Sequence, residues 1–245
     1  MAKTAVVTGA SSGIGAATVR ALRAGGWDVL AGARRTERLE QLAGETGCTW
    51  KPLDVTDQGS VDAFCDGIEQ LNLLVNNAGG ARGLEKVADT VDEHWRWMFE
   101  VNVLGVARMT RALLPALRAS GDGHVITIGS IAGYEAYPGG AGYNAAKFGA
   151  RAIMDALRLE LFGEPIRVTE IAPGLVAGAE FSLVRFDGDE QRAEKVYENT
   201  TPLRVEDIAA CVAFAAERPS HVNIDLMVVK PRDQARATMV HRGAR

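Results

Sequence analysis

The feature that most constrains the fold of this chain is a glycine-rich turn between a short apolar run and a helical pattern. The turn reads Thr-Gly-Ala-Ser-Ser-Gly-Ile-Gly over residues 8–15 and directly follows the apolar run Thr4–Val7. That run is typical of a short buried strand, and Ala16–Ala24 combines good helix formers with apolar periodicity. A strand, a glycine turn and a helix in this order are the context in which such a motif binds a dinucleotide.

The three glycines of the turn have separate expected roles. Gly9 permits the sharp turn after the strand, Gly13 lets the backbone approach a pyrophosphate, and Gly15 lets the helix pack closely on the strand. The start of the helix offers free N–H groups and its positive dipole end to phosphates. Three glycines alone are equally compatible with an ordinary strand-to-helix turn, so the interpretation depends on the rest of the chain.

Composition limits the architecture and the partners. With 245 residues, 47% of them apolar, the chain can bury one large core, and we expect a single domain over residues 1–245. Its 27 basic and 31 acidic residues give a formal net charge of −4, which provides no electrostatic footprint for nucleic acid or a membrane surface. No run approaches the roughly 20 apolar residues of a membrane span. We therefore expect a small-molecule substrate, and neither nucleic acid nor membrane as a partner.

Cysteine spacing bears on metals and on the cellular compartment. Cys48, Cys65 and Cys211 are odd in number, widely separated, and lack C-x-x-C spacing. Neither a disulfide framework nor a metal site is therefore expected. Met1–Lys3 leads directly into a strand rather than into an apolar signal segment, so we expect a soluble, unexported protein of the reducing cytoplasm.

Short apolar runs alternate with helical patterns along almost the whole chain. This alternation indicates parallel strands joined by crossover helices on both faces of a sheet. The expected fold is α/β, a single-domain doubly wound (Rossmann) parallel sheet, with a ligand beyond the carboxyl ends of the strands where the strand order reverses. The predicted strands are Ala5–Val7, Asp28–Ala33, Thr49–Leu53, Leu73–Val75, His124–Ile128, Arg167–Ile171 and Leu226–Val229.

The end of the second predicted strand bears on which dinucleotide is bound. An NAD site of this architecture usually has Asp or Glu about 20 residues beyond the glycines, but this chain has Arg34 and Arg35 there. Both arginines sit at the start of the predicted helix Thr36–Ala43, where cations oppose the helix dipole. A bound 2′-phosphate would turn that small cost into charge-assisted hydrogen bonds. We therefore expect NADP rather than NAD, with a pair of solvated surface arginines as the alternative.

Ser130, Tyr143 and Lys147 are the candidate catalytic residues. Tyr143 and Lys147 are four positions apart in a predicted helix, so both point to the same face, and Ser130 lies just beyond the strand His124–Ile128. Making a tyrosine an acid or base near neutrality requires a shift of roughly three pKa units, or about 4 kcal/mol. One ammonium at about 4 Å, helped by the positive charge of an oxidised nicotinamide, supplies roughly that energy at an effective dielectric near 20. Tyr143 would then exchange the substrate proton while Ser130 bonds the same oxygen, although each motif also occurs by chance.

In combination these motifs resemble the short-chain dehydrogenases/reductases of the compact, single-domain type, over essentially the whole chain. The resemblance also includes Asp54-Val55, Asn76–Gly79, Asn102 and Pro173-Gly174. It implies that Asn102 completes a catalytic tetrad by holding a water in a proton relay to Lys147, with a helix-packing amide as the alternative. The residues then expected to contact the cofactor are Gly9, Ser11, Ser12, Gly13, Ile14, Gly15, Arg34, Arg35, Asp54, Val55, Asn77, Ala78, Gly79, Tyr143, Lys147, Pro173, Gly174 and Val176.

The chain departs from the family pattern at one position, after the Pro-Gly turn. Family members usually have a threonine there that bonds the cofactor carboxamide, but this chain has Ala179, so backbone amides are expected to take that role. The resemblance places a substrate lid at about 173–201 and a basic tail at about 231–245, which we expect to pack on a neighbouring subunit of a homotetramer or dimer.

The sequence of the lid indicates the class of substrate. It is similar to that of the NADP-dependent 3-hydroxy acid dehydrogenases, a subgroup that includes serine and allo-threonine dehydrogenases and malonic semialdehyde reductases. Ser130, Tyr143 and Arg185 are the expected substrate-binding residues, with Arg185 clamping a carboxylate through its bidentate fork. Pairing of Arg185 with Glu180, Asp187 or Asp189 is the alternative.

The expected function is therefore hydride transfer between NADP(H) and a short 3-hydroxy acid. One alternative is a reductase of bulkier neutral ketones or 3-ketoacyl groups. The other is a binding module that senses NADP without turnover. Tyr134 and Tyr137 either line the pocket or pack in the core.

Overall fold

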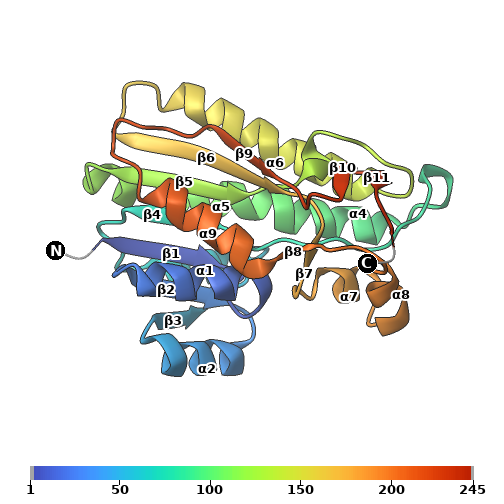
Figure 1. Ribbon diagram of the computed structural model, residues 1–245. Coiled ribbons are helices and arrows are strands. Elements are labelled where there is room, and N and C mark those ends of the chain that lie inside the picture. The colour runs from blue at the N-terminus through green and yellow to red at the C-terminus, as the bar shows by residue number, and fades with distance from the viewer. Residues whose placement is uncertain (1–2, 244–245) are drawn as a thin grey trace.

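The computed structural model describes residues 3–243, and its centre is a seven-stranded sheet in which every neighbouring pair of strands is parallel (Figure 1). The strand order is β3-β2-β1-β4-β5-β6-β9. The strands are β1 (Thr4–Thr8), β2 (Asp28–Ala33), β3 (Thr49–Pro52), β4 (Leu73–Asn76), β5 (Gly123–Ile128), β6 (Ile166–Pro173) and β9 (Leu226–Val229).

Helices cover both faces of this sheet. One face carries α1 (Gly13–Ala24), α2 (Thr36–Thr46) and α9 (Val205–Ala216), and the other carries α3 (Gln58–Cys65), α5 (Gly105–Ala119) and α6 (Ala141–Glu160). A further helix, α4 (Asp92–Phe99), packs against α6. Each strand contributes to both cores because successive side chains point to opposite faces. Thus Val7 and Ile126 lie in the core beneath α1 and α9, whereas Val6 and Val125 lie beneath α5 and α6.

The order of the strands reverses between β1 and β4. The chain runs outward from β1 through β2 to β3 and then crosses back to place β4 on the other side of β1. Crossovers that leave in opposite directions open a crevice at the carboxyl ends of these two strands. Asn77, just after β4, spans that point, because its Nδ2 donates to the Thr8 carbonyl oxygen at 2.9 Å.

The predicted fold class is confirmed. All seven predicted strands are present, and those at Asp28–Ala33 and Leu226–Val229 have the predicted bounds. The first helix begins at Gly13 rather than Ala16, because the last two glycines of the turn already belong to its first turn. The second continues three residues past Ala43, to Thr46, before Gly47 ends it in the left-handed conformation.

The predicted lid, which contains β7, and the predicted tail, which contains β10, both lie beyond the carboxyl ends of the strands (Figure 1). The lid segment (residues 173–201) contains β7 (Val176–Ala177), α7 (Phe181–Arg185) and α8 (Glu190–Lys195), and β7 pairs with β8 (Leu203–Arg204).

The tail forms an antiparallel pair, β10 (Gln234–Arg236) and β11 (Met239–Val240), and its last two positions, 244–245, lie outside the described residues. Arg242 of the tail donates to the carbonyl oxygens of Val196 and Glu198, at 3.1 and 2.7 Å. The tail therefore packs on the lid segment of its own chain.

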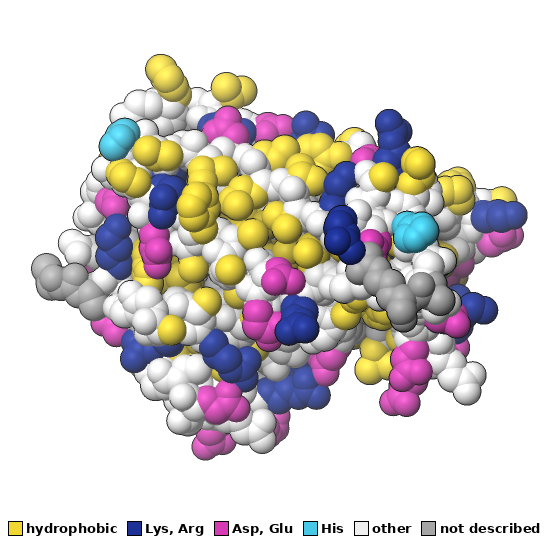
Figure 2. Space-filling view, in the orientation of Figure 1, with side chains coloured by type: hydrophobic (Ala, Val, Ile, Leu, Met, Phe, Trp, Pro, Cys, Tyr) yellow, Lys and Arg dark blue, Asp and Glu magenta, His cyan; other side chains and the backbone are white. Residues whose placement is uncertain are grey.

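Several hydrophobic side chains stay exposed on the surface. Figure 2 shows hydrophobic side chains gathered over the edge strand β9 and α9, where Phe214, Leu226 and Val228 are exposed. No helix within residues 3–243 has the length and apolar character needed to span a membrane. In the same range, no three His, Cys, Asp or Glu side chains form a metal-binding group, and Cys48, Cys65 and Cys211 are free thiols.

Candidate active site

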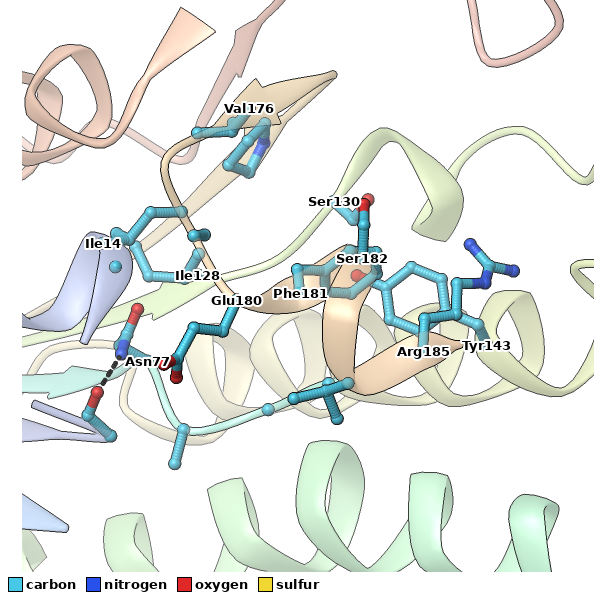
Figure 3. A pocket seen from close by; sticks show the side chains of 18 of the residues that line it. Ile14, Asn77, Ile128, Ser130, Tyr143, Val176, Glu180, Phe181, Ser182 and Arg185 are labelled. Atoms are coloured by element: carbon cyan, nitrogen blue, oxygen red, sulfur yellow. Dashed lines mark hydrogen bonds between the residues drawn. The ribbon is translucent and has the colours of Figure 1, made fainter. Parts of the chain in front are cut away.

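A cavity of about 660 Å³ lies along the carboxyl ends of the strands and is partly covered by the lid segment. Every residue predicted to bind cofactor or substrate or to act in catalysis lines it, except Gly15 and Asn102. Figure 3 shows its two ends, with Ile14, Asn77 and Glu180 at one and Ser130, Tyr143 and Arg185 at the other. The candidate cofactor and catalytic residues therefore lie at opposite ends of one cavity.

The glycine turn at the first end has the conformation that its sequence requires. Gly9 and Gly13 have φ angles of 65° and 54°, in the left-handed region that favours glycine. A side chain on Gly15 would clash with the carbonyl oxygen of Gly9 and would approach Nδ2 of Asn77 to 2.5 Å. Gly15 thus stays outside the cavity wall but allows α1 to pack closely on the ends of β1 and β4.

An anion site is formed where α1 and α2 begin. Nε and Nη2 of Arg35 donate to Ser11 Oγ at 3.2 and 3.1 Å, and Nη2 also donates to Ser12 Oγ at 2.8 Å. The Glu180 carboxylate of the lid segment binds at the same place, 2.7 Å from Nη1 of Arg35 and 2.6 Å from Nη1 of Arg38. Partial burial raises the pKa of Glu180, but hydrogen bonds from Arg38 and Arg35 bring it below its usual value. These residues therefore already hold one anion.

The two predicted arginines occupy different parts of this end. Arg34 is exposed and lies toward Asp54, whose pKa its charge helps to lower against the effect of partial burial. Arg35 instead joins the hydroxyls of the glycine turn. Sequence reasoning missed Arg38, although its spacing of three and four from the predicted pair in a helix is a usable signal. The hydroxyls and guanidiniums fit the 2′-phosphate of NADP at this end, where they now bind the Glu180 carboxylate.

Ser130, Tyr143 and Lys147 converge at the other end of the cavity. Ser130 follows β5 and caps the short helix η3 (Ile131–Gly133), with its Oγ accepting from the Ala132 N–H at 3.1 Å. Tyr143 and Lys147 project from one face of α6, and the Lys147 Nζ lies 5.8 Å from the Tyr143 ring centroid. The Phe181 ring of the lid segment covers Tyr143 at a centroid distance of 5.3 Å. A substrate oxygen at this end would meet Ser130 and Tyr143 away from bulk water.

Among the protein's own groups, burial has the largest effect on the pKa of Tyr143. Burial raises the pKa of Tyr143 well above its ordinary value, Tyr137 adds to the rise, and Ser130 and Arg185 only partly oppose it. Lys147 donates to the Ile128 carbonyl oxygen at 2.9 Å, and burial lowers its own pKa to about 8. The prediction placed the ammonium near the phenol but omitted the desolvation of both groups.

Asn102 and Lys147 both lie against Gly79, and both N–H groups of the Asn102 amide are bonded. Asn102 sits in η2 (Glu100–Leu104), a π-helical turn of the kind that is frequent at functional sites. Its Nδ2 donates to the carbonyl oxygens of Gly80 and Met98 at 2.9 and 2.8 Å, and its Oδ1 accepts from the Gly80 N–H at 3.2 Å. These bonds favour the packing alternative for the side chain, and the relay role stays a prediction.

Arg185 is buried in the cavity wall with one nitrogen unpartnered. Only 8% exposed, it donates through Nε to the Gly83 carbonyl oxygen at 2.9 Å and through Nη1 to the Tyr137 hydroxyl at 3.1 Å. Its Nη2 is buried without a hydrogen-bond partner. Within residues 3–243 no carboxylate forms an ion pair with Arg185, so the alternative of pairing with Glu180, Asp187 or Asp189 is wrong.

Other residues lining the cavity were either left open by the sequence or not assigned to it. Tyr137 lines the cavity, whereas Tyr134 does not and instead donates to Glu170. Gln234 and Arg242 of the tail also line the cavity, and no local motif marks them. Ala179, at the family's threonine position, lines the cavity opposite Gly13.

The chain is similar to a known protein family over most of its length. A family model described as short chain dehydrogenase matches residues 3–186. An uncharacterised oxidoreductase of Mycobacterium tuberculosis (strain H37Rv) is 56% identical over 236 residues, covering 96% of this chain and 94% of the relative. The NADP-dependent 3-hydroxy acid dehydrogenase YdfG of Salmonella typhi is 42% identical over 244 residues, covering 97% and 98%.

A solved structure shares both the fold and the sequence. The closed form of serine dehydrogenase complexed with NADP+ superposes with a TM-score of 0.93 and 40% identity, covering 98% of this chain and all (100%) of the other.

Proposed function

Because the chain belongs to the short-chain dehydrogenase family and is an NADP(H)-dependent oxidoreductase, we propose that its substrate is a short 3-hydroxy acid or the corresponding 3-oxo acid. The proposal depends above all on Arg185, a buried guanidinium with an unpartnered nitrogen at the same end of the cavity as Ser130 and Tyr143. A buried donor without a partner costs about 1–3 kcal/mol, which a carboxylate ligand would recover. The names of the similar dehydrogenases agree with this substrate class.

The proposed chemistry assigns one role to each residue. Bound NADP(H) supplies or accepts the hydride. Tyr143 exchanges the proton of the substrate hydroxyl, and Ser130 donates a hydrogen bond to the same oxygen as charge develops on it. Lys147 contributes the positive charge that favours the phenolate of Tyr143. Arg185 holds the carboxylate and thereby fixes the distance from the acid group to the reacting carbon.

A substrate panel tests this proposal. We expect NADP reduction, followed at the reduced-nicotinamide absorbance band, with serine, allo-threonine, 3-hydroxypropionate or 3-hydroxybutyrate, and little with neutral alcohols of the same size. Each compound is also assayed with NAD, and the corresponding carbonyl compounds with NADPH. Turnover restricted to bulkier neutral ketones or 3-ketoacyl thioesters would instead support the alternative reductase.

Arg185→Ala tests the carboxylate clamp directly. We expect the KM for a 3-hydroxy acid to rise by roughly 10- to 50-fold, because a charge-assisted hydrogen bond to a buried group is lost. The KM for a neutral alcohol of the same size should change little. Arg192→Ala is a matched control, since Arg192 belongs to the same lid segment but stacks on Phe186, 4.5 Å from the ring centroid. An equal loss for acids and alcohols would contradict the clamp.

Glu180→Gln tests how the lid segment affects cofactor binding. The Glu180 carboxylate pairs with Arg35, which we propose binds the 2′-phosphate, so the two anions compete for one guanidinium. Removing the charge should tighten NADPH by about 3- to 10-fold, in line with the modest worth of an exposed ion pair. NADH, which lacks the 2′-phosphate, should bind as before. Weaker NADPH binding in the variant, by fluorescence titration, would show that Glu180 closes over the cofactor instead of competing with it.

We also propose a homo-oligomer. Support comes from exposed apolar residues grouped on two separate surfaces, because large contiguous apolar patches mark interaction sites. One contains Phe214, Leu226 and Val228 near β9, and the other contains Phe99 and Phe148, which is on α6. Sedimentation analysis distinguishes a dimer or tetramer from a monomer.

A further inference from the structure

A buried carboxylate lies behind the candidate catalytic lysine, outside the cavity. Glu170 of β6 is only 3% exposed, and its Oε2 accepts a hydrogen bond from the Tyr134 hydroxyl at 2.5 Å. Its other oxygen, Oε1, is buried without a hydrogen-bond partner. An ionised carboxylate in such a place is expensive unless opposite charges compensate it. The proposed chemistry uses neither Glu170 nor Tyr134.

The carboxylate packs against the backbone that holds the catalytic groups. A side chain on Gly129 would clash with Oε1 of Glu170, so the carboxylate lies directly against this glycine. Gly129 joins Ile128, whose carbonyl oxygen accepts from Lys147 Nζ at 2.9 Å, to Ser130. Glu170 is therefore placed on the far side of the Ile128–Ser130 segment and interacts electrostatically with Lys147.

We propose that Glu170 is a positioning residue whose buried carboxylate, held by Tyr134, is the counter-ion that keeps Lys147 protonated. It touches neither substrate nor cofactor and acts through Lys147. The inference rests on the proposed role of Lys147 in proton transfer, and it adds that a charge on β6 sets the pH range over which the lysine can act.

The charged and titratable groups around the pair are few. From α6, Lys147, Arg151 and Asp155 face Glu170, and from the loop after η3, Tyr134 does. The Arg151 guanidinium stacks on the Tyr134 ring at 3.9 Å from the centroid and lies 3.7 Å from Asp155. The structure thus has two cations near Glu170 and one anion farther along the helix.

The direction of the effect follows from these charges. Burial lowers the pKa of Lys147 to about 8, and the negative charge of Glu170 is the interaction that opposes this lowering. The pKa of Glu170 itself is raised, because burial and the Asp155 charge outweigh the Tyr134 bond and the Lys147 and Arg151 charges that lower it. Without the carboxylate, Lys147 would lose its proton at a lower pH, and reduction of a carbonyl substrate would fail earlier on the alkaline side.

Glu170→Gln tests this inference, because the amide keeps the size of the side chain and removes the charge. We expect the pKa of Lys147, followed by the 13Cε shift in lysine-labelled protein without cofactor, to fall by roughly one unit. The resonance is assigned by its absence in Lys147→Met. The falling limb of kcat/KM for carbonyl reduction should move to lower pH by the same amount. Tyr134→Phe, which removes the bond to Glu170, should lower the Lys147 pKa and the falling limb by a smaller amount. Glu170→Asp keeps the charge and should leave both close to their wild-type values.

Thr169→Val is the matched control for a merely structural role. Thr169 directly precedes Glu170 in the same strand and points to the other face, where its hydroxyl bonds buried His124 at 2.8 Å. It should lower thermal stability and leave the Lys147 titration unchanged. An unaltered Lys147 titration in Glu170→Gln would overturn the inference. The Lys147 titration needs no substrate. If the proposed substrate class is wrong, only the substrate panel above gives a negative result, and the titration still tests the role of Glu170.

Discussion

Tyr143→Phe is expected to lower kcat for the 3-hydroxy acid by about a thousand-fold, within the range for removal of a general acid or base. The phenyl ring keeps the shape of the buried side chain and its contact with Phe181, so the cavity should be preserved. NADPH binding, measured by fluorescence titration, should change by less than about threefold, because the hydroxyl is the only group removed. Tyr143→Phe is thus expected to lose turnover while keeping its affinity for NADPH.

Tyr137→Phe is the matched control for that experiment. Tyr137 lines the same cavity and also loses one hydroxyl, the one that accepts from Arg185 at 3.1 Å. This variant should retain turnover with a modest change in KM for the acid. Comparable losses of kcat in both variants would mean that the pocket, rather than the Tyr143 proton, limits the reaction. Full activity of Tyr143→Phe would remove Tyr143 from the chemistry altogether.

The parts of the fold and site that were predictable from the sequence depend on local periodicity. Val6 and Val7 alternate between two buried faces, the glycines at 9, 13 and 15 require their turn, and Tyr143 and Lys147 share a helical face by spacing alone. Each of these features is fixed within a few residues of chain, so a single sequence contains enough information to recognise it.

The parts that were not predictable depend on contacts between distant segments. Glu180 reaches Arg35 across 145 positions, and Glu170 reaches Tyr134 across 36. No periodicity links such pairs. The effect of burial on the Tyr143 pKa was not predictable for a related reason, since spacing gives the position of the Lys147 charge but not the degree of burial that opposes it. Electrostatics at this site is therefore a property of the packed fold.

Replacing Arg34 and Arg35 together by alanine should weaken NADPH binding by about a hundred-fold and NADH binding by less than about threefold. On this assignment the two guanidiniums would donate charge-assisted bonds to the 2′-phosphate, each worth roughly 1.5–3 kcal/mol, and their exposure would reduce that value. The cofactor without the phosphate gains nothing from them. Titration of both reduced cofactors with each variant gives the ratio directly, and equal losses for NADPH and NADH would contradict the assignment.

The single variants separate the contributions of the two arginines. Arg35→Ala should account for most of the loss, because Arg35 is oriented by Ser11 and Ser12 whereas Arg34 is exposed toward Asp54. Arg35→Ala also leaves the Glu180 carboxylate with one cationic partner, Arg38, and its less compensated charge would then repel the 2′-phosphate. Combining Arg35→Ala with Glu180→Gln should therefore recover part of the NADPH affinity. The size of that recovery measures how strongly the lid carboxylate and the cofactor phosphate compete for one binding site.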